Sequence, residues 1–281
     1  MPMAELTVYS DAELQTIQRI ERQALVVLLD VCRKLDIPCF LIDGAAIGAV
    51  RHQGFIPWDD DLDVGMLRAD YRRFLDQAPA LLPEGYTLQT PYRDPSAPYF
   101  YSKLRVDGTV FMEYPNRKLK MHHGVYIDLC PFDQVPDDPK ADLRQYRRCR
   151  RLIRLFTLRQ SPDIGAPPDT PKRKALAALR AALHGVMRLV PRSLLANAIE
   201  RETTRYNGTI TRAVAFLHHP EHHVDYMLQT ELLPLGEGTF DGIRVPLPGN
   251  VDAYLRRHYG DYLCPPPPEQ RFGHKPWRVE V

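Results

Sequence analysis

Residues 41–66 read LIDGAAIGAVRHQGFIPWDDDLDVGM, and the pattern of this stretch decides the fold and chemistry expected of the whole chain. The last two aspartates, Asp61 and Asp63, alternate with apolar Leu62 and Val64. Residues two apart on a strand face the same way, with alpha carbons about 7 Å apart, so both carboxylates are expected to leave one face together. The pattern predicts a clamp for a divalent metal ion.

On the N-terminal side of this stretch, the sequence predicts a long helix, a short buried strand and a brief second helix. Apolar residues recur every three or four positions from Ser10 to Asp36, behind a Ser-x-x-Glu capping box. The strand, Cys39–Ile42, ends at a turn led by Gly44. The brief helix, Ala45–His52, is then expected to present free backbone amides to a phosphate group.

Beyond the aspartates, the sequence predicts a helix over Arg68–Leu82 and a series of short strands. Asp107-Gly108 is a pair typical of hairpin turns, so the strands on either side of it are expected to pair. The strands predicted in this part of the chain are Leu62–Met66, Tyr86–Thr90, Tyr99–Val106, Thr109–Tyr114 and Val125–Leu129.

A third aspartate, Asp128, lies on the last of these strands, which Pro131 is expected to end. Adjacent strands lie about 4.8 Å apart, so Asp128 is expected to converge with Asp61 and Asp63. Carboxylate oxygens suit Mg²⁺ or Mn²⁺, which take their remaining ligands from water and substrate phosphates. These residues therefore predict a metal-dependent enzyme that acts on a phosphate-bearing donor.

At this point the sequence resembles a known family. Gly44–His52 followed by Gly54–Asp63 is similar to the LicD family of phosphocholine transferases, relatives of fukutin. Later blocks look like family landmarks in the expected order, namely Ser102–Arg105, Tyr126–Asp133, Tyr259–Tyr262, Pro265-Pro266 and Arg271–His274. The matched blocks bracket nearly the whole chain, and the helical middle is the least specific part.

The resemblance implies an α+β fold of the nucleotidyltransferase type, in which helices flank a small mixed β-sheet. Residues 1–136 are expected to form the catalytic core and residues 137–215 a helical insertion. Residues 216–281 are expected to pack back on the core as a C-terminal extension. The three parts are expected to make one compact unit.

The resemblance also implies a reaction and roles for the aspartates. Asp61 and Asp63 correspond to the metal ligands, and Asp128 corresponds to the third acid. Family reactions move a phospho-alcohol, such as phosphocholine, from a CDP-activated donor to a hydroxyl of a glycan or glycolipid, here of lipopolysaccharide or teichoic-acid type. CDP-choline is the favoured donor. Ala45 stands where the family usually has a hydroxyl residue, so the backbone amides after Gly44 are expected to serve the phosphate.

Five further residues are candidates for the donor site, each with a simpler alternative. Arg51 and Lys103 lie beside motif residues and are expected to bind the diphosphate, unless they form surface ion pairs. Trp58 offers an aromatic face to a choline cation, and core packing is equally open. Arg271 and His274 match the family pattern and are expected to close over the donor, unless the tail merely packs on the core.

Two other segments allow two interpretations each. In the segment His218–His223, the spacing of His219 and His223 suits zinc, but Pro220 interrupts it and no cysteine is near, which favours a polar loop. The basic, amphipathic segment Lys172–Val190 predicts a helix that lies on a membrane surface or packs on the core. Packing on the core is favoured.

Composition limits the location and the partners of the chain. A 281-residue chain with 44% hydrophobic residues and a net charge of +2 is expected to be globular and not to coat nucleic acid. The five cysteines show no C-x-x-C spacing and are read as reduced thiols. No leader and no membrane span are recognised. A cytoplasmic protein follows, with peripheral contact at the inner face of the membrane left open.

Two other functions remain open. The same aspartates would serve a nucleotidylyltransferase, which moves the nucleoside monophosphate to a small molecule or protein. A non-catalytic binding protein that keeps the fold is the third hypothesis, because Ala45 replaces the usual hydroxyl residue.

Overall fold

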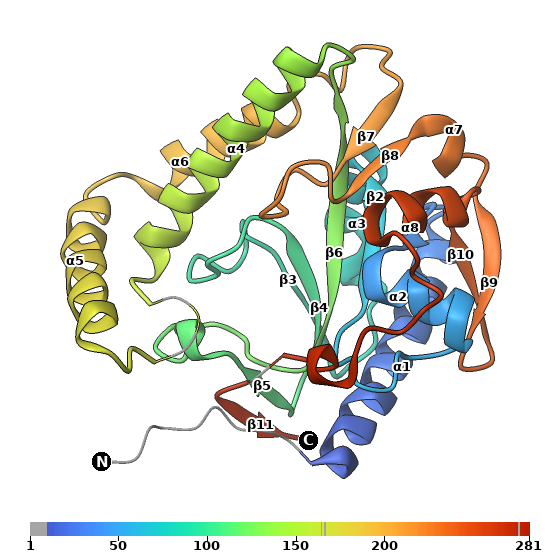
Figure 1. The fold of residues 1–281 in the computed structure, drawn as a ribbon, viewed down its shortest axis with the longest axis horizontal. Helices are drawn as coiled ribbons and strands as arrows, with labels where there is room; N and C mark the ends of the chain where they lie inside the picture. Colours follow the sequence, from blue (N-terminus) through green and yellow to red (C-terminus); the bar gives the residue numbers. More distant parts are fainter. Residues whose placement is uncertain (1–9, 164, 166, 275) are drawn as a thin grey trace.

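The structure, a computed structural model, describes residues 10–163, 165, 167–274 and 276–281. A mixed seven-stranded sheet lies at its centre (Figure 1). Its strands are β1 (Phe40–Leu41), β2 (Asp63–Leu67), β3 (Tyr86–Gln89), β4 (Ser102–Val106), β6 (Tyr126–Val135), β7 (Ala213–Ala215) and β8 (Tyr226–Leu228). Two smaller sheets pair β9 (Gly236–Phe240) with β10 (Ile243–Leu247) and β5 (Val110–Met112) with β11 (Arg278–Glu280).

The order β1-β2-β6-β4-β3 sets the geometry of the sheet, and β7 extends the far end of β6. β2 and β6 run parallel, whereas β1, β4 and β7 run antiparallel to the strands they join. The parallel register places Asp63 opposite Asp128. The predicted α+β class with a mixed sheet is confirmed.

Eight α-helices surround the sheets in the described part of the chain, with α1 and α3 packed against the central strands. The capping box at the start of α1 is confirmed, because Ser10 and Glu13 hydrogen-bond each other reciprocally. The α-helices are α1 (Asp11–Lys34), α2 (Asp43–Ile47), α3 (Arg68–Gln77), α4 (Pro139–Gln160), α5 (Pro171–Met187), α6 (Arg192–Thr203), α7 (Gln229–Leu232) and α8 (Val251–Tyr259). The predicted Ala45–His52 helix begins earlier, as α2, and continues as a π-helical segment over Gly48–His52.

Strand β6 continues past Pro131, so the prediction that this proline ends the strand was wrong. The amide of Asp128 donates to Leu62 O on the β2 side, so residue 131 directs its nitrogen to the opposite edge. On that edge β4 pairs only as far as Leu129, and β7 pairs from Asp133 onward. No ladder hydrogen bond is therefore lost at the proline.

The predicted hairpin across Asp107-Gly108 was also wrong. The chain does turn there, and Gly108 adopts φ 76°, but β4 already pairs with β3 on one edge and with β6 on the other. Strand β5 therefore leaves the central sheet and pairs with β11 near the C-terminus. The turn could be predicted from the local sequence, whereas the partner of β5 depended on which strands already pair with β4.

The helical middle of the chain lies along one side of the sheet, with α5 at the edge of the molecule (Figure 1). Helices α4 and α6 share an apolar cluster that includes Phe156, Ile199 and Ala213. None of the residues of α5, all of which the structure describes, is buried. The favoured packing of Lys172–Val190 on the core is confirmed at its C-terminal end, where Met187 and Val190 pack against this apolar cluster, whereas Leu179 is 57% exposed.

The domain boundaries at residues 136 and 215 stay a prediction. Among the described residues, we find no helix that combines the length and apolar character needed to cross a bilayer. The prediction that no leader is present falls on the N-terminal end, where residues 1–9 lie outside the described part.

Candidate active site

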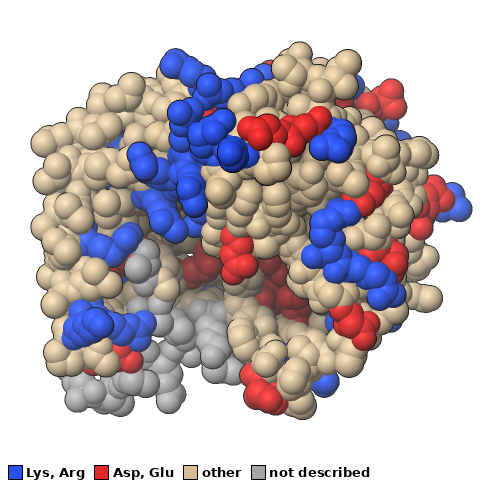
Figure 2. Space-filling view, turned by 45° about the horizontal axis from the view of Figure 1, so that its top comes forward, with Lys and Arg blue, Asp and Glu red and all other residues tan. Residues whose placement is uncertain are grey.

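The three predicted acids meet in one cavity of about 470 Å³ at the end of the parallel strands β2 and β6. Asp61 enters it from the segment just before β2, Asp63 from the first residue of β2, and Asp128 from β6. Figure 2 shows acidic side chains inside a hollow of the surface. The cavity is lined by Asp43, Gly44, Asp59, Asp61, Asp63, Tyr101, Asp128, Cys130, Phe216, His218, His219, Pro220, Asp225, Tyr259 and His274.

Gly44 allows the start of α2 to approach the acids closely. A Cβ atom at this position would lie 2.5 Å from Asp59 Oδ2, which is far inside van der Waals contact. The next residue, Ala45, is 2% exposed and packs in the apolar core. The cavity therefore meets the backbone at Gly44, while the side chain at position 45 belongs to the core.

Asp128 is held by a buried lysine on the neighbouring strand. Lys103 Nζ lies 2.6 Å from Asp128 Oδ1, and Lys103 is 2% exposed. The ammonium group also lies 3.4 Å from the ring centroid of Tyr126, a cation–π contact. The ion pair lacks hydrogen-bond geometry, and Asp128 Oδ1 accepts no hydrogen bond from the described residues. This oxygen keeps lone pairs that a metal ion can use.

The acids of the cavity raise one another's pKa values. Burial and the neighbouring Asp61 raise the pKa of Asp59 to about 8. The pKa of Asp63 lies well above its usual value because of burial, Asp61 and Asp128. Burial also raises the pKa of Asp61, although the charge of His274 opposes the shift. A cation placed among these carboxylates would remove the repulsion.

His274, from the C-terminal segment, is tied to the aspartate run. Its backbone N–H and its Nδ1 lie 2.9 and 3.0 Å from Asp60 Oδ1, and Asp60 is 1% exposed. Nδ1 also lies 3.9 Å from Asp61 Oδ2. Burial alone would lower the pKa of His274, but the hydrogen bond to Asp60 and the charge of Asp61 raise it to about 10. The imidazolium therefore places a positive charge at the cavity wall.

Asp43 and Asp225 form a second group of acids on the same cavity, and neither was predicted as a site residue. Asp43 Oδ1 accepts hydrogen bonds from Tyr254 and Tyr259, at 3.1 and 3.0 Å, and lies 3.4 Å from His258 Nε2. Asp225 is 2% exposed, and its Oδ1 has no hydrogen-bond partner among the described residues. Burial and Asp43 raise the pKa of Asp225 well above its usual value.

Glu21 of α1 is a further acid that sequence reasoning missed. It is 1% exposed, its Oε2 lacks a hydrogen-bond partner in the described part, and burial together with Asp61 and Asp60 raises its pKa well above the usual range. The sequence does contain a signal for this acid, because Glu21 lies four residues after Ile17 and so falls on the apolar stripe of the predicted helix. A lone acid on a buried helix face indicates a polar site beneath it.

The residues present fit a divalent cation. The donor set consists of carboxylate oxygens, which Mg²⁺ and Mn²⁺ prefer. Two buried oxygens, Asp128 Oδ1 and Asp225 Oδ1, lack hydrogen-bond partners among the described residues. A further set, Asp60, Asp61 and His274, offers ligand atoms that lie within 4.8 Å of one another. The cavity can therefore gather metal ions and, through them, the phosphates of a substrate.

Three other candidates for the donor site have partners of their own. The guanidinium of Arg51 donates to Tyr262 O and to His52 Nε2. Trp58 packs against the core, and the guanidinium carbon of Arg271 lies 5.0 Å from its ring centroid. The packing of Trp58 agrees with its simpler alternative, whereas the partners of Arg51 are a carbonyl oxygen and an imidazole and not the carboxylate of a surface ion pair. Gly44 and His274 line the cavity.

The four histidines divide between two places. His218 and His219 line the cavity, whereas His222 and His223 both contact Asp142 Oδ2 on α4. Both ring nitrogens of His218 lack partners among the described residues, and burial lowers its pKa to about 3. His219 and His223 therefore do not act as a zinc pair, although Asp142, His222 and His223 together could hold a metal ion.

Comparisons with known proteins match the part of the chain that carries the three predicted acids. Residues 36–148, which contain β1 to β6 and the acids Asp61, Asp63 and Asp128, match the family described as LicD/FKTN/FKRP, nucleotidyltransferase domain. The chain is 26% identical over 251 residues to the lipopolysaccharide cholinephosphotransferase LicD of Haemophilus influenzae. That alignment covers 87% of this chain and 89% of the relative.

Two uncharacterised rickettsial proteins match shorter segments. The protein of Rickettsia typhi is 34% identical over 86 residues, which is 28% of each chain. The protein of Rickettsia prowazekii is 39% identical over 59 residues, covering 21% of this chain and 22% of the relative. The predicted resemblance is confirmed by the family match and by the long alignment.

Proposed function

We propose that this chain, whose residues 36–148 match the LicD/FKTN/FKRP nucleotidyltransferase domain, is a phosphotransferase that transfers phosphocholine from CDP-choline to a hydroxyl of lipopolysaccharide. The observation that carries the proposal is the convergence of Asp61, Asp63 and Asp128 in one cavity within the matched domain. The Haemophilus influenzae relative is a lipopolysaccharide cholinephosphotransferase, which supports the choice of alcohol and acceptor.

In the proposed site, Asp61, Asp63 and Asp128 hold Mg²⁺ or Mn²⁺. When bound, the metal neutralises the diphosphate of the donor and the charge that develops on the leaving group. Lys103 fixes the carboxylate of Asp128 through the 2.6 Å ion pair. His274 adds a positive charge beside Asp61, which supports a role in closing the site over the donor.

The proposed reaction is an in-line displacement at the phosphorus atom that carries choline. The acceptor oxygen forms the new bond to phosphorus, the bond to the CMP oxygen breaks, and CMP leaves with the electron pair. A cavity carboxylate accepts the proton of the hydroxyl. Asp225 is the candidate for this base, because it lines the cavity and its Oδ1 has no hydrogen-bond partner among the described residues.

The aromatic residues that line the cavity favour a choline site different from the predicted one. Tyr101, Phe216 and Tyr259 line the cavity, whereas the ring of Trp58 is covered by Arg271. Aromatic faces attract a quaternary ammonium group through their ring quadrupole. We therefore assign choline to the three cavity aromatics, and the diphosphate to the metal and the backbone at Gly44, which lines the cavity, while Lys103 acts through Asp128.

A thermal-shift screen tests the donor. CDP-choline, CDP-ethanolamine, CDP-glycerol and CDP-ribitol are added with Mg²⁺ to the wild-type protein and to Asp61→Asn. A ligand that binds only the folded state raises the melting temperature. CDP-choline is expected to give the largest shift in the wild type and none in the variant. Equal shifts from all four donors would contradict the choice of choline.

Two alternatives predict different results. A nucleotidylyltransferase would leave label from alpha-labelled CTP or ATP on an acceptor, whereas the proposed enzyme releases labelled CMP from labelled CDP-choline. A non-catalytic protein would bind neither Mn²⁺ nor any CDP-alcohol in calorimetry.

We also place the protein in the cytoplasm, in peripheral contact with the inner face of the membrane. The supporting feature is α5, whose Leu176, Leu179, Leu183 and Val186 are 46–62% exposed and recur at helical spacing. Basic residues flank this apolar face, as in helices that lie on anionic membranes. The acceptor is proposed to be a glycolipid, so such a helix would bring the enzyme to its substrate.

Sedimentation with anionic vesicles tests this placement. Leu179→Gln with Leu183→Gln is expected to reduce vesicle binding strongly. Ile210→Gln is the matched control, because Ile210 is an exposed apolar residue outside α5. Equal binding by the control and the double variant would contradict the placement.

A further inference from the structure

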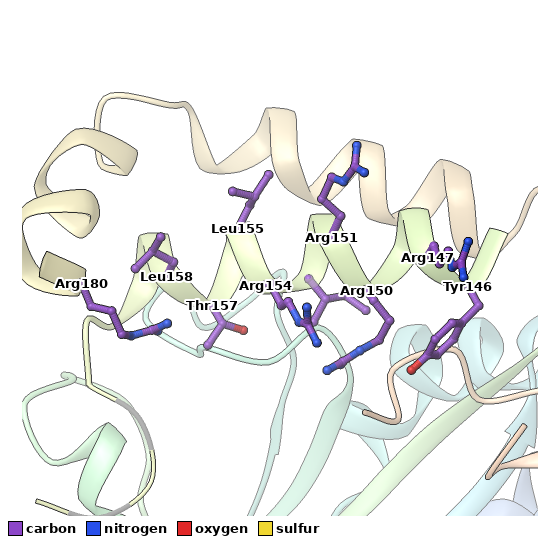
Figure 3. Close-up of a pocket in the computed structure, with 10 residues that line it drawn as sticks. Tyr146, Arg147, Arg150, Arg151, Arg154, Leu155, Thr157, Leu158 and Arg180 are labelled. Carbon is purple, nitrogen blue, oxygen red and sulfur yellow. The ribbon is translucent and has the colours of Figure 1, made fainter. Parts of the chain in front are cut away.

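A second cavity, of about 720 Å³, lies beneath α4 and is rich in arginine. We call it the arginine groove and define it by Arg147, Arg150, Arg151 and Arg154 of α4 and Arg180 of α5. Figure 3 shows Arg150, Arg154 and Arg180 pointing to the same side of α4, while Arg151 points away at the rim. The sequence predicted a helical insertion here but no binding site.

The arginine groove carries positive charge that the described residues do not neutralise. Other arginines of α4 have acidic partners: Arg144 lies 3.9 Å from Asp138, and Arg148 lies 3.7 Å from Glu202. In the part of the chain that the structure describes, the α4 arginines of the groove form no ion pair with a carboxylate. Burial lowers the pKa of Arg150, whose Nε is buried without a hydrogen-bond partner there. An anion would satisfy these groups.

The arginine groove shares a wall with the catalytic cavity. His218 and Pro220 line the catalytic cavity. On the other side of the same segment, Arg150 NH1 donates to His218 O at 3.3 Å, and Tyr146 OH donates to Pro220 O at 2.5 Å. Figure 2 shows basic side chains gathered beside the hollow that holds acidic ones. The acidic catalytic cavity and the basic arginine groove therefore lie on opposite sides of a single segment of chain.

From this arrangement we propose that the arginine groove binds anionic groups of the acceptor, the phosphates of a glycolipid, and holds the acceptor next to the catalytic cavity. This inference rests on the proposed transferase function. The donor diphosphate belongs with the metal among the acids, so a second anion site serves the other substrate. Arginine suits phosphate because its planar guanidinium donates two parallel hydrogen bonds. Arg180 of α5 connects the groove to the helix with the exposed leucines, where a lipid-anchored acceptor would arrive.

Acceptor kinetics provide the first test. The double variant Arg147→Gln with Arg154→Gln changes two exposed residues, and its fold is checked by its melting temperature. We expect the KM for lipopolysaccharide to rise about tenfold or more, which corresponds to the loss of at least one charge-assisted contact. The Kd for CDP-choline is expected to stay unchanged. The matched control, Arg144→Gln with Arg148→Gln, removes the same charge from the ion-paired arginines of α4 and is expected to keep the wild-type KM.

Direct binding separates this inference from the proposed reaction. Phosphatidylcholine vesicles carrying native or chemically dephosphorylated lipopolysaccharide are titrated with wild-type protein and both double variants, without any donor. The wild type is expected to prefer the native form, and Arg147→Gln with Arg154→Gln is expected to lose that preference. If the wild type prefers native lipopolysaccharide but transfers no phosphocholine, the proposed function is refuted and the anion site is supported. Normal transfer with an unchanged KM, or equal binding of both lipopolysaccharides, would overturn the arginine groove.

Discussion

Asp63 and Asp128 lie directly opposite each other on the parallel strands β2 and β6. The pairing is fixed by the backbone, since the amide of Asp128 donates to Leu62 O at 2.9 Å. Two acids more than sixty positions apart in the sequence therefore reach the same cavity through strand register. Changes to either side chain should leave the register intact, so their effects can be read as effects on the site.

The crowded acids make the metal-free protein less stable as pH rises. Asp59 has a pKa of about 8 in the folded state, raised by burial and by Asp61, whereas an unfolded chain releases this proton near pH 4. Between these values the folded state binds more protons, so stability decreases with rising pH. Urea unfolding of metal-free protein should show this decrease between pH 5 and pH 8. Mn²⁺ should raise the melting temperature more at pH 8 than at pH 5.

Asp59→Asn should reduce this pH dependence. Loss of one such group flattens the slope by up to about 1.4 kcal/mol per pH unit inside the window. Asp261→Asn, at an exposed position, is the control and should keep the wild-type slope. If Asp59→Asn also keeps that slope, the repulsion assigned to the cavity is wrong.

Lys103 and Asp128 should behave as a coupled pair. Lys103→Met leaves a buried carboxylate without its cation and should destabilise the protein by about 3 kcal/mol. Adding Asp128→Asn should recover most of this loss, because no charge then remains uncompensated. Urea unfolding of the two single variants and the double variant measures the coupling. Additive effects would show that the ion pair does not stabilise the site.

Gly44→Ala should impair transfer with little effect on stability. The added Cβ would lie 2.5 Å from Asp59 Oδ2, so the carboxylate must move. A shift of this size is expected to lower kcat/KM about tenfold, because small displacements in an active site are costly. Gly208→Ala, where an added Cβ meets no atom within 4 Å, serves as the control. Equal losses in kcat/KM for both variants would argue against a special role for Gly44.

The parts of the site set by local geometry were predictable from the sequence. Alternation of Asp61 and Asp63 with apolar residues indicates one strand face, and Asp128 lies on a second buried strand. The structure brings all three to one cavity. The spacing of Ser10 and Glu13 likewise identified the start of α1, because a capping box is a contact within one helical turn.

Features that depend on distant chain segments were not predictable in this way. Asp225 joins Asp43 only because the chain returns beside α2 just before β8. The strand beyond Pro131 persists because two neighbouring strands leave a gap there, which no local pattern reveals. The leucines of α5 form an ordinary amphipathic pattern, and only the structure shows that Leu176, Leu179 and Leu183 stay 46–57% exposed.

The most direct test of phosphocholine transfer is mass spectrometry of lipopolysaccharide after incubation with CDP-choline, Mg²⁺ and the protein. Wild-type protein should add phosphocholine to the acceptor and release CMP, whereas Asp63→Asn, with an unchanged fold, should add none. Unmodified lipopolysaccharide after incubation with folded wild-type protein, or full transfer by Asp63→Asn, would contradict the proposed reaction at this site.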